Sequence, residues 1–343
     1  MRRLLVLLLV LFTASVTVAG PVITSVTPAS GPTTGGTAVV IKGTGFSNAC
    51  PVCSPPFFTP GVAFEGNFAT SVHFVDSTTI EAVTPPHLPG KVSVSVSQFD
   101  DSAILDDAFL YEGDLEDTFE TILFPIFMPP VHGAFGSEFR TSARLWNQGS
   151  AVVVFFGTDT SCSLADPPIF PDQRYALPVN GPEQVLFTDC STSTGRLFYV
   201  PKGSGSSVAA NLRVTDVSRA AASNGVEIPV VREADFRHDR IALLNVPLDP
   251  RFRNTLRIYA LKPGFVNVTI NDQVYPVPLT AGANRFEPAF ASFSDFPAKS
   301  QLPGNPSSIR VVIDTPQGLD MPIWAFISST NNVTQEITLV TPN

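Results

Sequence analysis

Two segments of the sequence place arginines and an aromatic residue in the same order. Residues 139–146 and 252–259 each begin with Phe-Arg, carry a second arginine at the sixth position and end on an aromatic residue. Guanidinium groups pair with carboxylates, and aromatic rings pack against the face of a sugar ring, so these residue types could hold an acidic sugar. The candidate binding residues are Arg140, Arg144, Trp146, Arg253, Arg257 and Tyr259.

The elements that would position these side chains are two β-strands. Side chains alternate along a strand, so one face of each segment holds both arginines and the aromatic residue, and the other face is mainly apolar. The polar face could be exposed and bind a ligand. Alternatively, its arginines meet carboxylates on neighbouring strands, or the face packs at a domain interface.

No other residues form a recognisable catalytic or metal-binding motif. The histidines are His73, His87, His132 and His238. They lie in separate segments and never at metal-ligand spacing. Acidic clusters at residues 100–101, 106–107 and 114–117 could give oxygen ligands to calcium at a domain junction, but they match no defined calcium loop and also suit solvated turns. We therefore predict a non-enzymatic protein with no metal site and no cofactor.

The N-terminus has the pattern of a secretory signal. Arg2 and Arg3 precede an apolar run at residues 4–12, and Ala19 and Gly20 offer a cleavage point. The run is shorter than the ~20 apolar residues of a membrane helix. We expect residues 1–20 to be a signal peptide whose removal leaves a secreted, extracellular or cell-surface protein with no integral membrane segment.

The net charge argues against nucleic acid as a partner. It is −9 at pH 7, and loss of the two signal arginines would take it to about −11. Nucleic-acid binding needs clustered lysines and arginines that displace counterions from phosphates. The chain has no such electrostatic footprint.

The composition predicts an all-β chain. Its 32 prolines and 23 glycines separate short runs rich in Val, Ile, Thr and Phe, which is typical of sandwiches. The one Ala-rich polar stretch, residues 219–224, is shorter than two helical turns. At ~100 to 200 residues per domain, the chain should hold two or three domains.

The first part of the chain has a recognisable order of strands and turns. Residues 22–26 alternate as a strand, residues 28–31 make a turn, and Gly35 and Gly36 free the backbone before a strand at 37–42. Later strands are expected at 61–65, paired with 68–75, and at 79–83, 91–97 and 108–111. This pattern closely resembles the IPT/TIG family over residues 21–113. The resemblance implies an immunoglobulin-like sandwich used for binding or spacing rather than one activity.

An insertion at residues 48–60 carries Cys50-Pro-Val-Cys53 and the pair Phe57 and Phe58. No helix N-terminus is predicted there to stabilise a thiolate, so we favour a structural disulfide over a redox centre or half of a metal site. The two phenylalanines cover the edge of the core or form an exposed contact tip.

The remaining cysteines, Cys162 and Cys190, are expected to pair with each other in an exported protein. Pairing Cys50 with Cys53 and Cys162 with Cys190 keeps each bridge inside one domain. The second bridge would close a loop of roughly 28 residues and stabilise the fold by ~3 to 4 kcal/mol on the chain-entropy model.

The sequence predicts a duplication in the second part of the chain, because four matches recur in order. The arginine motif matches its second copy, and each copy is followed by a β-branched run, at 151–156 and 265–270. Residues 206–214 match 307–313, and 226–231 match 319–324 with a proline inside an apolar strand. We predict two related β-sandwich domains at residues 118–234 and 235–343.

These features predict an extracellular protein that acts in adhesion, scaffolding or ligand binding. The IPT/TIG-like domain would be a spacer or contact unit, and the duplicated pair the larger functional body. The alternative is a carbohydrate-binding or accessory protein for polysaccharide use. An exposed ring at Trp146 or Tyr259 would favour this alternative, and burial of both rings would oppose it. The expected partner is an extracellular protein or polysaccharide.

Overall fold

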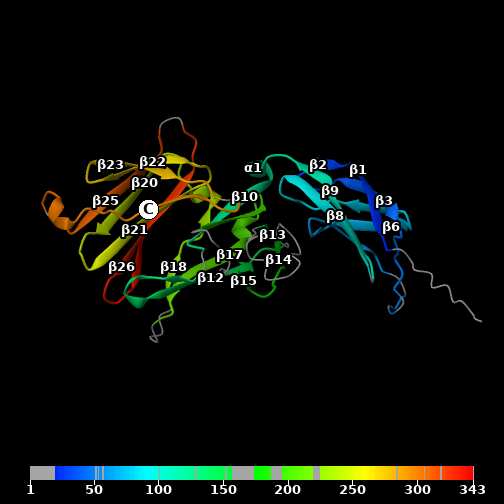
Figure 1. Ribbon diagram of the computed structural model, residues 1–343, viewed down its shortest axis with the longest axis horizontal. Coiled ribbons are helices and arrows are strands. Elements are labelled where there is room, and N and C mark those ends of the chain that lie inside the picture. The colour runs from blue at the N-terminus through cyan, green and yellow to red at the C-terminus, as the bar shows by residue number, and fades with distance from the viewer. Residues whose placement is uncertain are drawn as a thin grey trace, which may run out of the picture. The chain divides into compact units, whose positions relative to one another are not determined.

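The computed structural model describes residues 20–50, 52, 54–55, 58–99, 101–127, 130–150, 153–156, 174–186, 195–218, 225–282, 285–304, 306–316 and 319–342. The chain divides after Asp114 into two compact units, drawn from blue to cyan and from green to red in Figure 1. Both are built from β-sheets, so the prediction of an all-β fold is confirmed. The short helix α1 (Leu115–Thr118) opens the second unit. No helix within the described residues is long and apolar enough to cross a membrane.

The first unit is a sandwich of two sheets. One sheet has the order β1 (Val22–Thr27), β3 (Ala38–Thr44), β7 (Thr79–Val83) and β6 (Ser71–Asp76). The other has the order β2 (Ser30–Pro32), β9 (Ser102–Glu112), β8 (Gly90–Ser97), β4 (Gly61–Phe64) and β5 (Asn67–Phe68). The predicted immunoglobulin-like sandwich is confirmed.

Alternation along the strands builds the core of this unit. In β3, Val39 and Ile41 are buried, and in β8 the buried residues are Val92, Val94 and Val96. The residues between them are partly or fully exposed. Each strand therefore presents one apolar face to the opposite sheet, as a period of two residues requires.

One predicted pairing in this unit is wrong. β4 pairs with β5 and β8, whereas β6 pairs with β7 in the opposite sheet. The chain passes from one sheet to the other between Ala69 and Thr70. The N–H of Ala69 bonds to the carbonyl of Val62 in β4, and the N–H of Thr70 bonds to the carbonyl of Val83 in β7. A single β-rich run thus serves both sheets, because alternation does not show where a strand changes partner.

The second unit begins with a five-stranded sheet and its partner. The first sheet has the order β14 (Arg174–Leu177), β13 (Val153–Phe156), β16 (Gly195–Pro201), β10 (Phe119–Pro125) and β19 (Val231–Arg232). The second has the order β11 (Val131–His132), β12 (Glu138–Asn147), β17 (Val208–Asp216) and β18 (Val226–Ile228), and β15 (Gln184–Leu186) also pairs with β12.

The C-terminal half of this unit adds two four-stranded sheets. One has the order β20 (Arg240–Pro247), β25 (Ser308–Asp314), β22 (Gly264–Ile270) and β23 (Gln273–Leu279). The other has the order β24 (Ala289–Phe293), β21 (Phe252–Ala260), β26 (Ile323–Asn331) and β27 (Ile337–Val340). Leu256, Ile258, Val266, Val268 and Val311 lie in the continuous apolar core between them.

The two sandwiches of the second unit share one topology. The order β14-β13-β16-β10 recurs as β23-β22-β25-β20, and β15-β12-β17-β18 recurs as β24-β21-β26-β27. The sandwiches are therefore related, with the two arginine motifs on the equivalent strands β12 and β21. The boundary between 234 and 235 stays a prediction.

Two of the four sequence matches align the wrong strands. Residues 206–214 lead into β17, the counterpart of β26, but 307–313 contain β25. Residues 226–231 contain β18, the counterpart of β27, but 319–324 lead into β26. Ser-Ser before an apolar run, and proline within one, mark strand ends generally, so they do not fix which strands correspond.

Hydrogen bonds and an ion pair join the two sandwiches. The N–H of Leu197 in β16 bonds to the carbonyl of Phe286 at 2.7 Å. Arg196, only 1% exposed, lies 4.0 Å from Glu287. The N–H of Ile126 bonds to the hydroxyl of Tyr259 at 3.2 Å. The second arginine motif is therefore tied to the first sandwich.

Candidate functional site

The first arginine motif lies on an exposed face of β12. Arg140 and Arg144 are exposed, and Trp146 is 41% exposed. Arg140 pairs with Glu138 at 3.1 Å, and Arg144 pairs with Glu183 at 2.7 Å. The predicted alternation is observed, and both arginines already have carboxylate partners. Both arginines therefore already have a carboxylate counter-charge in the structure.

The ring of Trp146 is held against a loop. Its indole N–H donates to the carbonyl of Gly181 at 3.2 Å, and Gly181 lies in the loop between β14 and β15, the strand that pairs with β12. An exposed tryptophan is present as the sequence suggested. Trp146 does not line any of the three cavities described below.

The second motif is placed differently, and of the alternatives given for its polar face the structure has the one in which the face packs at an interface. Tyr259 is fully buried, its ring lies beside those of Phe290 and Phe326, and its hydroxyl accepts the bond from Ile126. Burial strongly raises the pKa of this hydroxyl. The polar face of β21 packs against the N-terminal sandwich of the second unit. Tyr259 therefore cannot form part of a surface platform.

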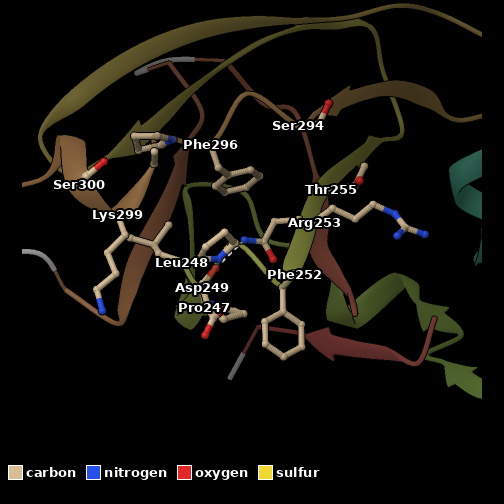
Figure 2. Close-up of a pocket in the computed structure, with 14 residues that line it drawn as sticks. Pro247, Leu248, Asp249, Phe252, Arg253, Thr255, Ser294, Phe296, Lys299 and Ser300 are labelled. Carbon is tan, nitrogen blue, oxygen red and sulfur yellow. Dashed lines mark hydrogen bonds between the residues drawn. The ribbon is translucent and has the colours of Figure 1, made fainter. Parts of the chain in front are cut away.

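A cleft of about 710 Å³ lies at the start of β21. It is lined by the loop between β20 and β21, by the first residues of β21 and by the segment after β24. Figure 2 shows Phe252, Phe296 and Lys299 around it, whereas the guanidinium of Arg253 extends away from the other labelled side chains. A cleft of this volume, lined by aromatic rings and a few polar groups, has the size and character of a ligand pocket.

The backbone of β21 is open along this cleft. β26 pairs with the whole of β21, but β24 pairs only with its last five residues, from Leu256 to Ala260. No strand in the described part of the chain pairs with residues 252–255 on the β24 side. All four of these consecutive residues line the cleft. Because side chains alternate between faces, the cleft must run along the strand's edge.

The register shows which backbone groups face the cleft. Phe290 exchanges both hydrogen bonds with Thr280, on the side of β24 away from β21. Backbone groups alternate in direction along a strand, so Phe293 faces β21 and its partner Leu256 faces β24. Asn254 lies two residues before Leu256, so its N–H and C=O point to the same side. They form a free donor and acceptor on the cleft.

The side chain of Asn254 adds a second unusual group. Asn254 is 8% exposed, and its Nδ2 donates to the carbonyl of Pro247 at 2.6 Å. Its Oδ1 is buried without a hydrogen-bond partner. A buried polar atom that makes no hydrogen bond costs ~1 to 3 kcal/mol, so a water or a ligand that bonded to this oxygen would be stabilising.

Charged groups lie at the rim of the cleft. Asp249 accepts two hydrogen bonds from the Arg251 side chain, at 3.0 and 2.7 Å. These bonds, followed by the bond from the backbone N–H of Arg251, lower the pKa of Asp249 to about 2. Lys299 lies in the segment after β24, which forms the opposite wall of the cleft. The cleft therefore presents one aspartate that remains ionised and one lysine.

A different cavity of about 410 Å³ contains acid-base residues. His238 lies 2.9 Å from Asp320, Lys262 lies 3.6 Å from Glu116, and Glu233 accepts a bond from the N–H of Thr121. Neither serine nor cysteine occurs among its lining residues. The hydroxyl groups on its lining belong to Thr121 and Tyr199.

The other histidines have separate surroundings. His73 lies 3.2 Å from Glu81, His87 is buried with its Nδ1 2.8 Å from the carbonyl of Leu88, and His132 is exposed. Of the acidic clusters, Asp100 lies outside the described residues. Within the described residues, no three His, Cys, Asp or Glu side chains are grouped to hold a metal ion.

The cysteine loop is described only in part. Cys50 is buried and disulfide-bonded. Cys53, Cys162 and Cys190 lie outside the described residues, so both predicted pairings stay predictions. Phe57 also lies outside them, and Phe58 is half-buried with its N–H bonded to the carbonyl of Asn48 at 2.9 Å.

Sequence reasoning found Arg253 but missed the cleft beside it. The sequence signal was a turn with two prolines, at Pro247 and Pro250, immediately before the second motif. It predicts a loop at the start of β21. It does not indicate that residues 294–300, more than forty positions away, form the opposite wall.

Comparison with known families supports the assignment of the first unit. Residues 21–111 match the family model of the IPT/TIG domain. The predicted resemblance is therefore confirmed for this part of the chain. No curated protein matches the chain.

Solved structures also resemble the chain at low sequence identity. An auxiliary nutrient binding protein from Bacteroides thetaiotaomicron is 10% identical, with 94% of this chain and 59% of that chain covered and a TM-score of 0.22. A protein of the same description from Bacteroides ovatus is 12% identical, with 94% and 70% covered and a TM-score of 0.24. SGBP-B from a complex xyloglucan utilization locus in Bacteroides uniformis is 11% identical, with 95% and 74% covered and a TM-score of 0.20. The chain thus spans less than two thirds of the first of these structures.

Proposed function

We propose that this chain is a non-enzymatic β-sandwich protein that binds its ligand outside the cell and that the cleft at the start of β21 is the ligand site. The observation that carries the proposal is the unpartnered Oδ1 of Asn254 beside an unpaired strand edge. Buried polar groups in folded proteins are normally satisfied. A ligand in the cleft would supply the missing partners.

Adhesion or ligand capture fits this geometry better than catalysis. The cleft holds an aspartate kept ionised by Arg251, and its histidine-free lining offers no general base poised near neutral pH. The N-terminal signal pattern supports a function outside the cell. The first unit, an IPT/TIG domain, then serves as a spacer or a second contact surface.

Carbohydrate is the ligand class that one specific observation favours. Phe252 and Phe296 are half-buried rings at the cleft, and the free backbone groups and Oδ1 of Asn254 offer hydrogen bonds of both kinds. Sugar hydroxyls can both donate and accept, and the apolar face of a pyranose packs on aromatic rings. We propose this cleft in place of the surface platform that the sequence suggested at Trp146 and Tyr259.

The test is a binding screen of the full chain against polysaccharides and extracellular-matrix proteins. Ser294→Trp should fill the cleft from an exposed position on its wall and weaken binding at least about tenfold, a loss of about 1.4 kcal/mol. Ser292→Trp is the matched control, because Ser292 is also exposed but does not line the cleft. Binding that survives Ser294→Trp would place the ligand elsewhere.

Two further results separate the ligand classes. Saturable glycan binding that Phe296→Ala weakens and Phe265→Ala preserves would support carbohydrate, since Phe265 is exposed on β22, outside the cleft. Binding to a matrix protein alone would reject carbohydrate and keep adhesion. No binding to either set would contradict the proposed function.

A further inference from the structure

A cavity of about 220 Å³ lies where the two sandwiches of the second unit meet. The first sandwich contributes apolar side chains to it: Ile126, Val131, Phe139, Val214 and Ile228. The second sandwich contributes mainly polar ones from its polar face: Arg253, Thr255, Arg257, Ser328 and Thr330. The cavity thus has an apolar wall opposite two guanidinium groups and three hydroxyls. No aspartate or glutamate lines it.

The two arginines have only neutral partners. Arg257 donates to the Oγ of Ser328 at 2.6 Å and lies 5.9 Å from the centre of the Phe326 ring. Arg253 donates to the amide oxygens of Asn332 and Gln335, at 3.0 and 2.7 Å. Each guanidinium has five N–H donors, so most of the donors on Arg257 remain available.

Other arginines of the described chain meet carboxylates instead. Arg240 pairs with Asp314, Arg251 with Asp249, and Arg213 with Glu227. Burial lowers the pKa of both Arg253 and Arg257, and no carboxylate offsets that effect at either residue. Both guanidinium groups are partly buried, so an anion in the cavity would supply a counter-charge that they lack.

We propose that this cavity binds the carboxylate of a small organic acid. A carboxylate would pair with the guanidinium of Arg257 and accept hydrogen bonds from the hydroxyls beside it. The apolar wall would pack against the carbon chain of the acid, which an inorganic oxyanion lacks. At ~30 Å³ per water, the cavity has room for about seven waters, enough for an acid of a few carbons.

This acid site is distinct from the proposed ligand cleft. Arg253 and Thr255 line both spaces, but Arg257, Ser328 and the apolar wall line the cavity alone. A substitution of Arg257 therefore tests the acid site, and a substitution of Ser294 tests the cleft. Ser294→Trp should leave acid binding unchanged, so failure of one proposal does not imply failure of the other.

The experiment measures the affinity of the full chain for sodium acetate, butyrate and sulfate at constant ionic strength, by calorimetry and by the shift of the thermal midpoint. Butyrate should bind in a saturable way and about tenfold more tightly than acetate, because its two extra methylenes contact the apolar wall. Sulfate should bind more weakly than either acid. Sulfate binding as tight as butyrate binding would overturn the assignment to an organic acid.

Variants then locate the site. Arg257→Met should weaken butyrate binding at least about tenfold, and Arg257→Lys, which keeps the charge but loses the fork, should weaken it less. Arg144→Met is the matched control, because Arg144 occupies the equivalent motif position on β12 but is exposed and paired with Glu183. Absence of any midpoint shift with wild-type protein, or equal losses in Arg257→Met and Arg144→Met, would refute the proposal.

Discussion

Replacing Tyr259 with phenylalanine tests how the two sandwiches of the second unit are held together. The hydroxyl of Tyr259 is buried and accepts the hydrogen bond of the Ile126 N–H at 3.2 Å. Tyr259→Phe removes this acceptor and keeps the ring among Phe290, Trp324 and Phe326. The packing of the aromatic cluster is therefore preserved, and the hydrogen bond is the quantity under test.

The magnitude follows from the burial of the donor. Ile126 is 5% exposed, so its N–H cannot readily turn to water when the hydroxyl is lost. A buried donor left without its acceptor costs about 1 to 3 kcal/mol. For a unit of 150 to 250 residues, each kcal/mol lowers the thermal midpoint by about 2 to 4 °C. We expect the midpoint of the second unit to fall by about 2 to 12 °C.

Differential scanning calorimetry of the full chain measures this change, with Tyr275→Phe as the control. The hydroxyl of Tyr275 donates to Gln273 Oε1 at 2.7 Å at an exposed position, so its removal should cost less than about 0.5 kcal/mol. Equal midpoints for Tyr259→Phe and Tyr275→Phe would refute the reasoning. They would mean that the bond to Ile126 does not stabilise the contact between the sandwiches.

Three further predictions concern single side chains of the second unit. Hydrogen bonds from the Arg251 side chain and backbone lower the pKa of Asp249 to about 2, whereas the usual aspartate pKa is about 3.9. The stability that this pair contributes is therefore present above about pH 3.9 and is lost as the pH falls towards 2. The difference in urea midpoint between wild type and Asp249→Asn should therefore shrink between pH 5 and pH 2, and a constant difference would contradict this assignment. The chain has two tryptophans, Trp146 at 41% exposed and Trp324 at 5% exposed. In Trp324→Phe, iodide should strongly quench the remaining fluorescence of Trp146. In Trp146→Phe, iodide should hardly quench the remaining fluorescence of Trp324. Ile258→Ala, at a fully buried core position, should lower the free energy of unfolding by about 2 to 5 kcal/mol in urea titrations, and a change below 1 kcal/mol would argue against the core.

The sequence predicted the strands of the arginine motifs well but not their environment. Alternation in β12 and β21 placed Ala143 and Leu256 on the buried faces, as observed. The polar faces of the two strands look alike in sequence. That of β12 is exposed, whereas that of β21 packs against the N-terminal sandwich of the second unit. Periodicity shows which side chains share a face of the strand. Whether that face is exposed or buried depends on contacts with segments far away in the sequence.

The cleft and the acid site could not be predicted for the same reason. Their walls come from strand ends and loops whose meeting depends on how far each strand pairs. β24 ends at Phe293, and this early end is what exposes the edge of β21 at Asn254. A difference of a few residues in strand length leaves little signal in a sequence, although it determines where a pocket opens.

The open edge of β21 also bears on how the protein behaves at high concentration. An unpaired edge is a template for a strand from another molecule, and proteins guard such edges with prolines and charges. Pro250 and Pro297 stand on either side of this edge, and Lys299 follows on the same wall. Proline lacks the N–H that a ladder needs, so a ladder could not extend past Pro250, and an incoming strand would meet the positive charge of Lys299. The prolines and the lysine that line the cleft are therefore of the residue types that disfavour pairing with a second copy of the chain.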